Sequence, residues 1–159
     1  MNVHARRLAV ILLLVANVAR SHPAPNSMLR LDFQSRAVHA EYWLPVSELG
    51  YAQPGESESG LAAYLLRRLH AESPSGDAWD IRVKTIREDR YMDHDYLVAE
   101  LHLAPPAGVA ARPFVLLDDV ITHEVRNHIV FVVENHVGGN RLIGMLQYPN
   151  RRLAVPASE

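Results

Sequence analysis

The stretch "LRLDFQSRAVHAEYWLP", residues 29–45, decides the fold of this chain. Apolar and polar side chains alternate in it twice, over residues 29–33 and again over residues 38–44, with a short polar turn between. Successive side chains of a β-strand point to opposite faces, so this period of two predicts two half-buried strands. Pro45 has no amide hydrogen to give to a sheet and is expected to end the second strand.

The rest of the chain carries the same strand signature, interrupted by proline, glycine and polar residues. One stretch, "GLAAYLLRRLHAE" at residues 60–72, differs. Its side chains Leu61, Leu65 and Leu69 recur at the spacing of a helix face, which predicts one short amphipathic helix. The polar stretch before it, residues 51–60, is predicted to be a loop. Further strands are predicted at residues 79–86, 96–103, 142–148 and 153–155.

The longest apolar stretch, residues 112–134, needs a break. Its 23 residues exceed the usual strand length of about 3–10 residues, so a turn must lie inside it. We place this turn at Arg126-Asn127 and keep Asp118-Asp119 as the alternative. Roughly seven or eight strands with short polar links then favour a mainly β fold, an antiparallel β-sandwich of the immunoglobulin-like kind with one short amphipathic helix. No repeat and no second domain are visible.

The first 21 residues have the three parts of an export signal. A basic start and an apolar run over residues 8–16 lead to a small-residue exit that ends at Ser21. The run is shorter than the roughly 20 apolar residues that a transmembrane helix needs. We therefore predict a signal peptide at 1–21, cleavage before His22 and an extracytoplasmic domain at 22–159, exported to the periplasm or the outer face of the inner membrane. An uncleaved or differently cut leader is the alternative.

Composition narrows the classes of function. The chain has 16 basic and 18 acidic residues. Without the leader, which holds three arginines and no acid, 13 basic and 18 acidic residues remain. Nucleic-acid binding needs a basic patch, so nucleic acid is not an expected partner. The absence of cysteine excludes disulfides, thiolate metal sites and a cysteine nucleophile. No nucleophile elbow, phosphate loop or dinucleotide fingerprint occurs, so we expect that the chain binds no nucleotide and is not an enzyme.

Histidine is the residue type that carries the predicted site. Cleavage would leave His22 first, where its ring and free α-amine offer two nitrogens, and Pro23 has no amide hydrogen for a metal to displace. In "VITHEVRNHIVFVVENH", residues 120–136, a turn between His123 and His128 would bring the two rings together across a hairpin. Such nitrogen-rich sites suit copper, nickel, cobalt or zinc. We predict a divalent metal site of His22, His123 and His128. The alternatives are a frayed terminus and ordinary surface histidines.

Two adjacent acids, Asp118 and Asp119, lie inside the long apolar stretch. Neighbouring strand residues point to opposite faces, so these two do not form a paired acid and base. Each could instead orient a histidine or support a turn. His39, His70 and His102 lie on predicted polar faces and are expected to be ordinary surface residues.

Several short motifs, taken in their order and spacing, resemble the extracytoplasmic N-terminal region of the HupE/UreJ family of membrane proteins. They are "HPAPNS" after the leader, "LRLDF" followed by "AVHAEYWLPVSEL", "YLLRRLHAESPSG" followed by Trp79, and "DVITHEVRNHIVFV". The resemblance implies a domain that precedes a transmembrane bundle, an accessory role for hydrogenase or urease, and permeation of nickel or cobalt. Position by position it covers Pro25-Asn26-Ser27 and the same three histidines.

The chain also departs from that family. It ends at Glu159 without a transmembrane bundle, and "ENHVGGN" stands where a tryptophan-containing loop is expected. We expect no transport by this chain alone, since it shows no segment long and apolar enough to span a bilayer. We therefore expect a non-catalytic exported domain that binds a divalent transition metal for sensing or delivery, either detached or from a truncated gene. The alternative is a protein-interaction module that docks on an integral membrane protein without metal.

Overall fold

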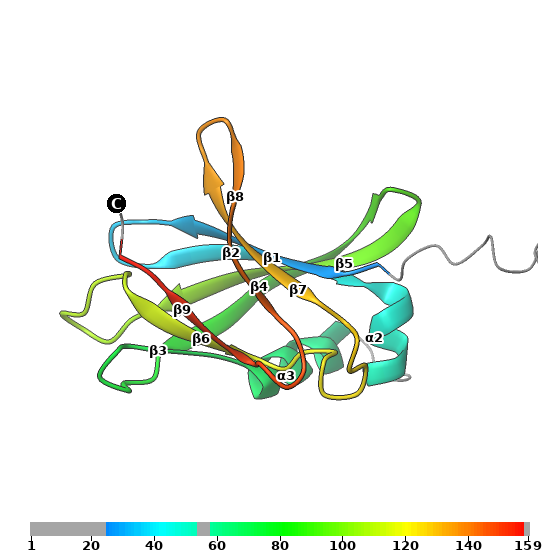
Figure 1. Cartoon of the computed structure of the whole chain (residues 1–159), viewed down its shortest axis with the longest axis horizontal. Helices are drawn as coiled ribbons and strands as arrows, with labels where there is room; N and C mark the ends of the chain where they lie inside the picture. Colours follow the sequence, from blue (N-terminus) through cyan, green and yellow to red (C-terminus); the bar gives the residue numbers. More distant parts are fainter. Residues whose placement is uncertain (1–24, 54–57, 158–159) are drawn as a thin grey trace, which may run out of the picture.

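The computed structural model describes residues 25–53 and 58–157, which form two packed layers (Figure 1). The expected mainly β, sandwich-like fold is confirmed. Within the described ranges there are nine strands and two helices: β1 (Ser27–Phe33), β2 (Val38–Pro45), α2 (Val46–Ala52), α3 (Glu58–Arg68), β3 (Leu69–Glu72), β4 (Asp80–Tyr91), β5 (His94–Ala104), β6 (Phe114–Asp118), β7 (Val130–His136), β8 (Gly139–Leu146) and β9 (Arg152–Val155).

The first layer is a six-stranded sheet in the order β4-β5-β2-β1-β7-β8. Its neighbours are antiparallel except β1 and β7, which run parallel with Ser27 opposite Val130, so the sheet is mixed. A parallel pair requires the chain to cross over through other structure. Because the two strands point the same way, the residues that precede β1 and the residues that precede β7 lie at the same end of the sheet.

The second layer consists of a three-stranded sheet, β3-β6-β9, together with the two helices. In Figure 1 this sheet and α3 lie beneath the large sheet. The alternation of the opening strands explains the core, since every second side chain of β1 and β2 faces the second layer. The largest fully buried side chains come from both layers and include Leu29, Leu31, Tyr42, Leu44, Tyr64, Leu65, Leu69, Phe114 and Leu116.

The helices differ from the sequence prediction. Pro45 ends β2 as expected, but the chain turns directly into α2, whose buried Leu49 and Ala52 are too few to show a helical period. The predicted helix at 60–72 ends early, because Leu69 and Ala71 pair with β6 and continue as strand β3. In the ranges that the structure covers, no helix is long and apolar enough to span a bilayer.

The long apolar stretch does contain a turn, as predicted, but the turn is longer than expected. Residues 119–129, called here the β6–β7 loop, separate β6 from β7. The loop contains Arg126-Asn127, and it begins at Asp119, directly after Asp118 ends β6. Backbone hydrogen bonds from Glu124 and Val125 to the carbonyl of Ile121 shape the loop. The hairpin expected between His123 and His128 is wrong, because β6 and β7 belong to different sheets and both histidines lie in the loop that joins the layers.

Candidate functional site

Asp118 anchors the start of the β6–β7 loop to the core through two hydrogen bonds. It is buried, with 1% of its surface exposed. The hydroxyl of Tyr42 in the large sheet donates to Oδ2 at 2.7 Å, and the backbone N–H of Val120 donates to Oδ1 at 2.9 Å. Burial raises the pKa of the Asp118 carboxyl to about 7, although both hydrogen bonds favour the charged form. Asp118 therefore supports the turn, one of the two roles expected for it.

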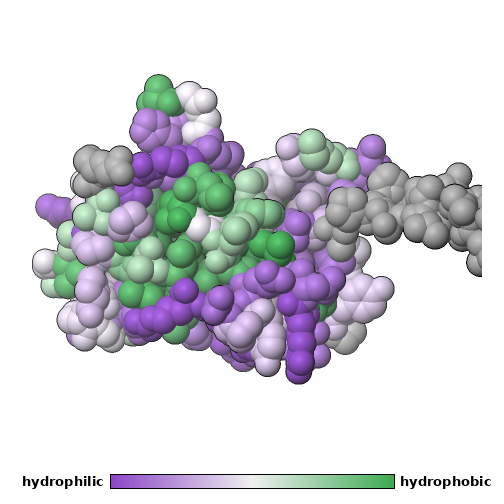
Figure 2. Space-filling view, viewed as in Figure 1, coloured by the Kyte–Doolittle hydropathy of each residue, from purple (hydrophilic) through white to green (hydrophobic). Residues whose placement is uncertain are grey.

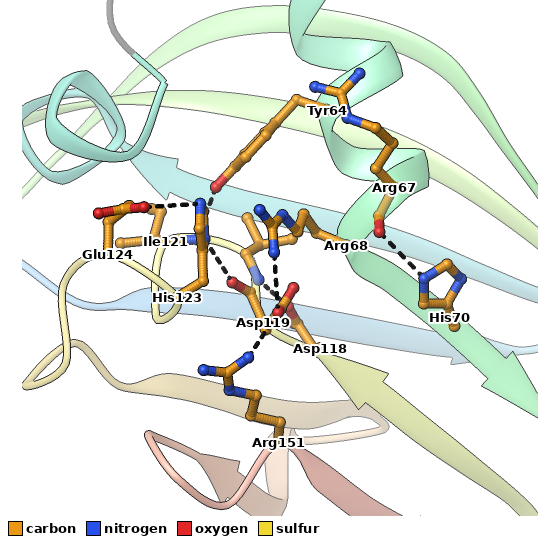
Figure 3. Close-up of polar contacts among 11 residues, drawn as sticks. Tyr64, Arg67, Arg68, His70, Asp118, Asp119, Ile121, His123, Glu124 and Arg151 are labelled. Carbon is orange, nitrogen blue, oxygen red and sulfur yellow. Dashed lines mark hydrogen bonds and ion pairs between the residues drawn. The ribbon is translucent and has the colours of Figure 1, made fainter.

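Asp119 points the other way, toward the surface (Figure 3). Its carboxylate pairs with Arg68 at the end of α3, 3.2 Å away, and with Arg151 just before β9, 2.8 Å away. The two acids therefore point in different directions, Asp118 toward Tyr42 in the core and Asp119 toward the two arginines, as expected for neighbouring residues of an extended chain. Asp119 joins three segments that are distant in sequence.

His123 is oriented by the backbone carbonyl of Asp119, which lies 3.0 Å from Nδ1 (Figure 3). A carbonyl only accepts, so Nδ1 carries the hydrogen and, in the neutral ring, Nε2 keeps its lone pair. The Nε2 atom lies 4.0 Å from a carboxylate oxygen of Glu124, and the ring packs against Tyr64 with 5.8 Å between centroids. Histidines that bind metals commonly have this arrangement, with the other ring nitrogen bonded to a carbonyl.

His128, at the other end of the loop, is almost completely enclosed, with 1% of its side chain exposed. Its Nε2 lies 2.8 Å from the hydroxyl of Ser27 in β1, and its Nδ1 lies 4.0 Å from Glu48 in α2. Burial lowers the pKa of the ring to about 4, so the ring is neutral near pH 7. Next to it, Ile129 exchanges hydrogen bonds with Asn26 and Ser27. This cluster holds the beginning of β1 against the beginning of β7.

The predicted metal site is only partly within the described residues, since His22 lies outside them. In residues 25–53 and 58–157 no group of three or more histidine, aspartate or glutamate side chains is placed to hold a metal ion. His128 touches Ser27, which is five positions after His22. Five residues of extended chain span at most ~18 Å. Because His22 itself lies outside the described residues, the three-histidine site stays a prediction.

Sequence reasoning missed the partners of the loop. Its partners come from three elements and from the residue before β9, and no local pattern identifies contacts of such long range: Tyr42, Glu48, Arg68 and Arg151. The histidines that were expected to be ordinary surface residues contact residues outside the loop. His39 and His102 face each other across β2 and β5 with 5.1 Å between ring centroids, and the ring of His70 lies 3.2 Å from the backbone oxygen of Arg67.

Comparison with known proteins adds no relative. No protein-family model matches the sequence, and no curated protein matches it. The likeness to HupE/UreJ proteins rests on the short motifs alone, and membership of that family stays a prediction.

Proposed function

We propose that this chain is a non-catalytic exported domain that binds a divalent late transition metal at the end of the large sheet where β1 and β7 begin. Sensing or delivery of the ion, next to membrane proteins of the HupE/UreJ kind, is the role that the motif resemblance supports. The observation that carries the proposal is the parallel pairing of β1 with β7, tied by the contact between Ser27 and His128. It puts Asn26 and Ser27, near the start of the described residues, beside the loop that contains His123 and His128.

His123 is the best-prepared ligand in the described part of the chain. Its Nδ1 is held by a carbonyl, its Nε2 lone pair is available, and Glu124 offers an oxygen beside it. His128 would have to give up its bond to Ser27 before it could bind an ion. The geometry supports His123 as a ligand, and the proposal adds His22, which lies outside the described residues, as the other principal ligand. His128 supports them by holding the start of β1, and it becomes a third ligand only if that bond opens.

The donor set determines the class of metal. An α-amine and two imidazoles are nitrogen ligands that suit copper, nickel, cobalt or zinc, and a carboxylate oxygen can complete such a site. Calcium and magnesium prefer sites made of oxygen ligands alone. The ring nitrogens and the amine must be unprotonated to bind, so affinity is expected to fall on acidification.

The test begins with mass spectrometry of the exported protein to establish its first residue. Calorimetric titration with copper, nickel and zinc salts should then show one ion per chain, and binding should be lost in His123→Ala or when one residue is added ahead of His22. His136→Ala is the matched control, because this exposed histidine in β7 lies outside the loop. Unchanged affinity in His123→Ala, or equal loss in the control, would overturn the proposal.

A separate observation favours a second candidate function, docking on a membrane protein. On the outer face of the large sheet the register aligns an apolar row across four strands: Trp43, Met28, Phe131 and Met145. Leu142 and Met145 on the edge strand β8 are each 56% exposed, and Figure 2 shows a hydrophobic area where β8 crosses the visible face. Edge strands of this kind can accept a partner strand. Met145→Asp should abolish capture of the partner and leave metal titration unchanged.

A further inference from the structure

The outer face of the small sheet contains a cleft of about 370 Å³ that the metal proposal does not use. Its floor is Leu117 of β6, which is half-buried. The strand register places His70 of β3 on one side of Leu117 and Arg152 of β9 on the other. Arg68 and Arg151, which grip Asp119, complete the wall at the end of β6.

Positive charge outweighs negative charge in this cleft. Four arginines line it, whereas the chain as a whole has a net charge of −2. On the negative side, Asp119 is shared by two of these arginines, and Glu72 pairs with Arg152 at 2.8 Å. Asp118 lies beneath the surface and is bonded to Tyr42. In Figure 3 the guanidinium of Arg67 points away from Asp119, so this residue adds charge at the rim.

The donors match an anion with oxygens in several directions. Arg68 and Arg151 each use Nη1 on Asp119, and a guanidinium has five N–H donors in a planar fork. Donors therefore remain on the α3 side and on the β9 side of Leu117. A planar carboxylate presents its two oxygens in one plane, whereas a tetrahedral phosphate offers an oxygen to each wall. Arginine is also the residue type best suited to phosphate recognition.

We propose that this cleft binds a phosphate group, held by Arg152 on one side and by Arg68 and Arg151 on the other, above Leu117. The group can belong to a free phosphate or to the headgroup of an anionic lipid, since both present the same oxygens. The proposal is independent of the metal site.

The experiment is calorimetric titration of the whole protein with inorganic phosphate at low salt, with a chelator present so that bound metal cannot contribute. The variant is Arg152→Gln, because Arg152 is 60% exposed and its removal leaves the contacts of Asp119 intact. Arg82→Gln is the matched control, since Arg82 lies in β4, outside the cleft, is 66% exposed and also pairs with an acid, Asp80 of the same strand. Arg152→Gln should weaken phosphate binding about tenfold or more, the loss expected for a charge-assisted hydrogen bond.

A second arm identifies the source of the phosphate. Vesicles of phosphatidylcholine with added phosphatidylglycerol are compared with vesicles of phosphatidylcholine alone in a sedimentation assay. Binding to the anionic vesicles alone, reduced by Arg152→Gln, supports the lipid source. Phosphate binding without vesicle binding supports the free ligand. If neither probe binds, or if Arg82→Gln weakens binding as much as Arg152→Gln does, the proposal is wrong.

Discussion

The two ends of the β6–β7 loop use the same residue type in opposite ways. His128 is enclosed between β1 and α2, with a hydrogen-bond partner on Nε2 and a carboxylate near Nδ1. His123, five positions earlier, is anchored through one nitrogen and offers the other. The difference teaches that histidines close in sequence can divide into one that holds the fold and one available for chemistry. Both side chains are largely buried, with 10% of His123 and 1% of His128 exposed, so the hydrogen bonds make the difference: His128 uses Nε2 to bond Ser27, whereas His123 is bonded through Nδ1.

Replacement of the enclosed ring should have the largest effect. His128→Ala leaves a cavity and removes the partner of the Ser27 hydroxyl, so we expect the free energy of unfolding to fall by about 2–4 kcal/mol. Denaturant titration followed by circular dichroism measures it. A smaller loss than in His123→Ala would reverse the comparison between the two ends of the loop.

Acidification should lower the stability of the protein through the same residue, His128. The pKa of His128 is about 4 in the folded protein against 6.5 for an ordinary histidine, so between these values the unfolded chain binds a proton that the folded chain does not. Stability should therefore decrease as the pH falls from about 6.5 to about 4, by about 3 kcal/mol at most. Urea unfolding at several pH values tests this.

Asp118 changes stability with pH in the opposite direction to His128. Its raised pKa makes the folded protein hold a proton up to about pH 7, which the unfolded chain has already lost. Its stabilising contribution is complete below about pH 3.8 and is lost as the pH rises through 7. Asp118→Asn removes this term and should make the acid loss from His128 steeper. An equally steep loss in His128→Gln would show that another group is responsible.

At the outer end of the loop, Asp119→Asn should have a moderate effect. It leaves Arg68 and Arg151 without their shared carboxylate, and partly exposed ion pairs of this kind are worth about 1 kcal/mol in unfolding free energy. His123 bonds to the backbone carbonyl of Asp119 and not to its carboxylate, so metal affinity should be unchanged. A parallel loss of metal binding would show that the carboxylate itself takes part.

His123→Ala should cost less stability than His128→Ala. It removes one hydrogen bond and one ring contact from a side chain that is 10% exposed, and we expect the free energy of unfolding to fall by about 1 kcal/mol. Metal binding, by contrast, should be lost. Thermal unfolding of the same samples with and without zinc measures both quantities, and a metal-dependent rise in melting temperature that survives in His123→Ala would contradict the assignment.

The strands of the large sheet could be predicted from sequence because alternation is a local signal. Residues 29–33 and 38–44 fall within β1 and β2, and the core uses their apolar positions. Residues 60–72 show the limit of such reasoning. The helical spacing of Leu69 is real, but pairing with Asp118 draws that position into a strand, because tertiary contacts override local propensity.

The site could be predicted only in part. The histidines were identified from their chemistry, and the opposite directions of Asp118 and Asp119 followed from strand geometry. The burial of His128 could not be foreseen, because it depends on β1 and β7 running parallel. The pairing of Arg68 and Arg151 with one carboxylate could not be foreseen either, since the two arginines are 83 positions apart in the sequence.

The position of β1 has a consequence for how the chain matures. Among the strands of residues 25–53 and 58–157 it is synthesised first, yet it lies in the interior of the sheet, between β2 and β7. Its second neighbour is complete only at His136, so the sheet cannot close until most of the polypeptide has emerged. Pairings of such long range raise the contact order and slow folding. A chain with this strand order therefore stays incompletely folded until most of it has been synthesised.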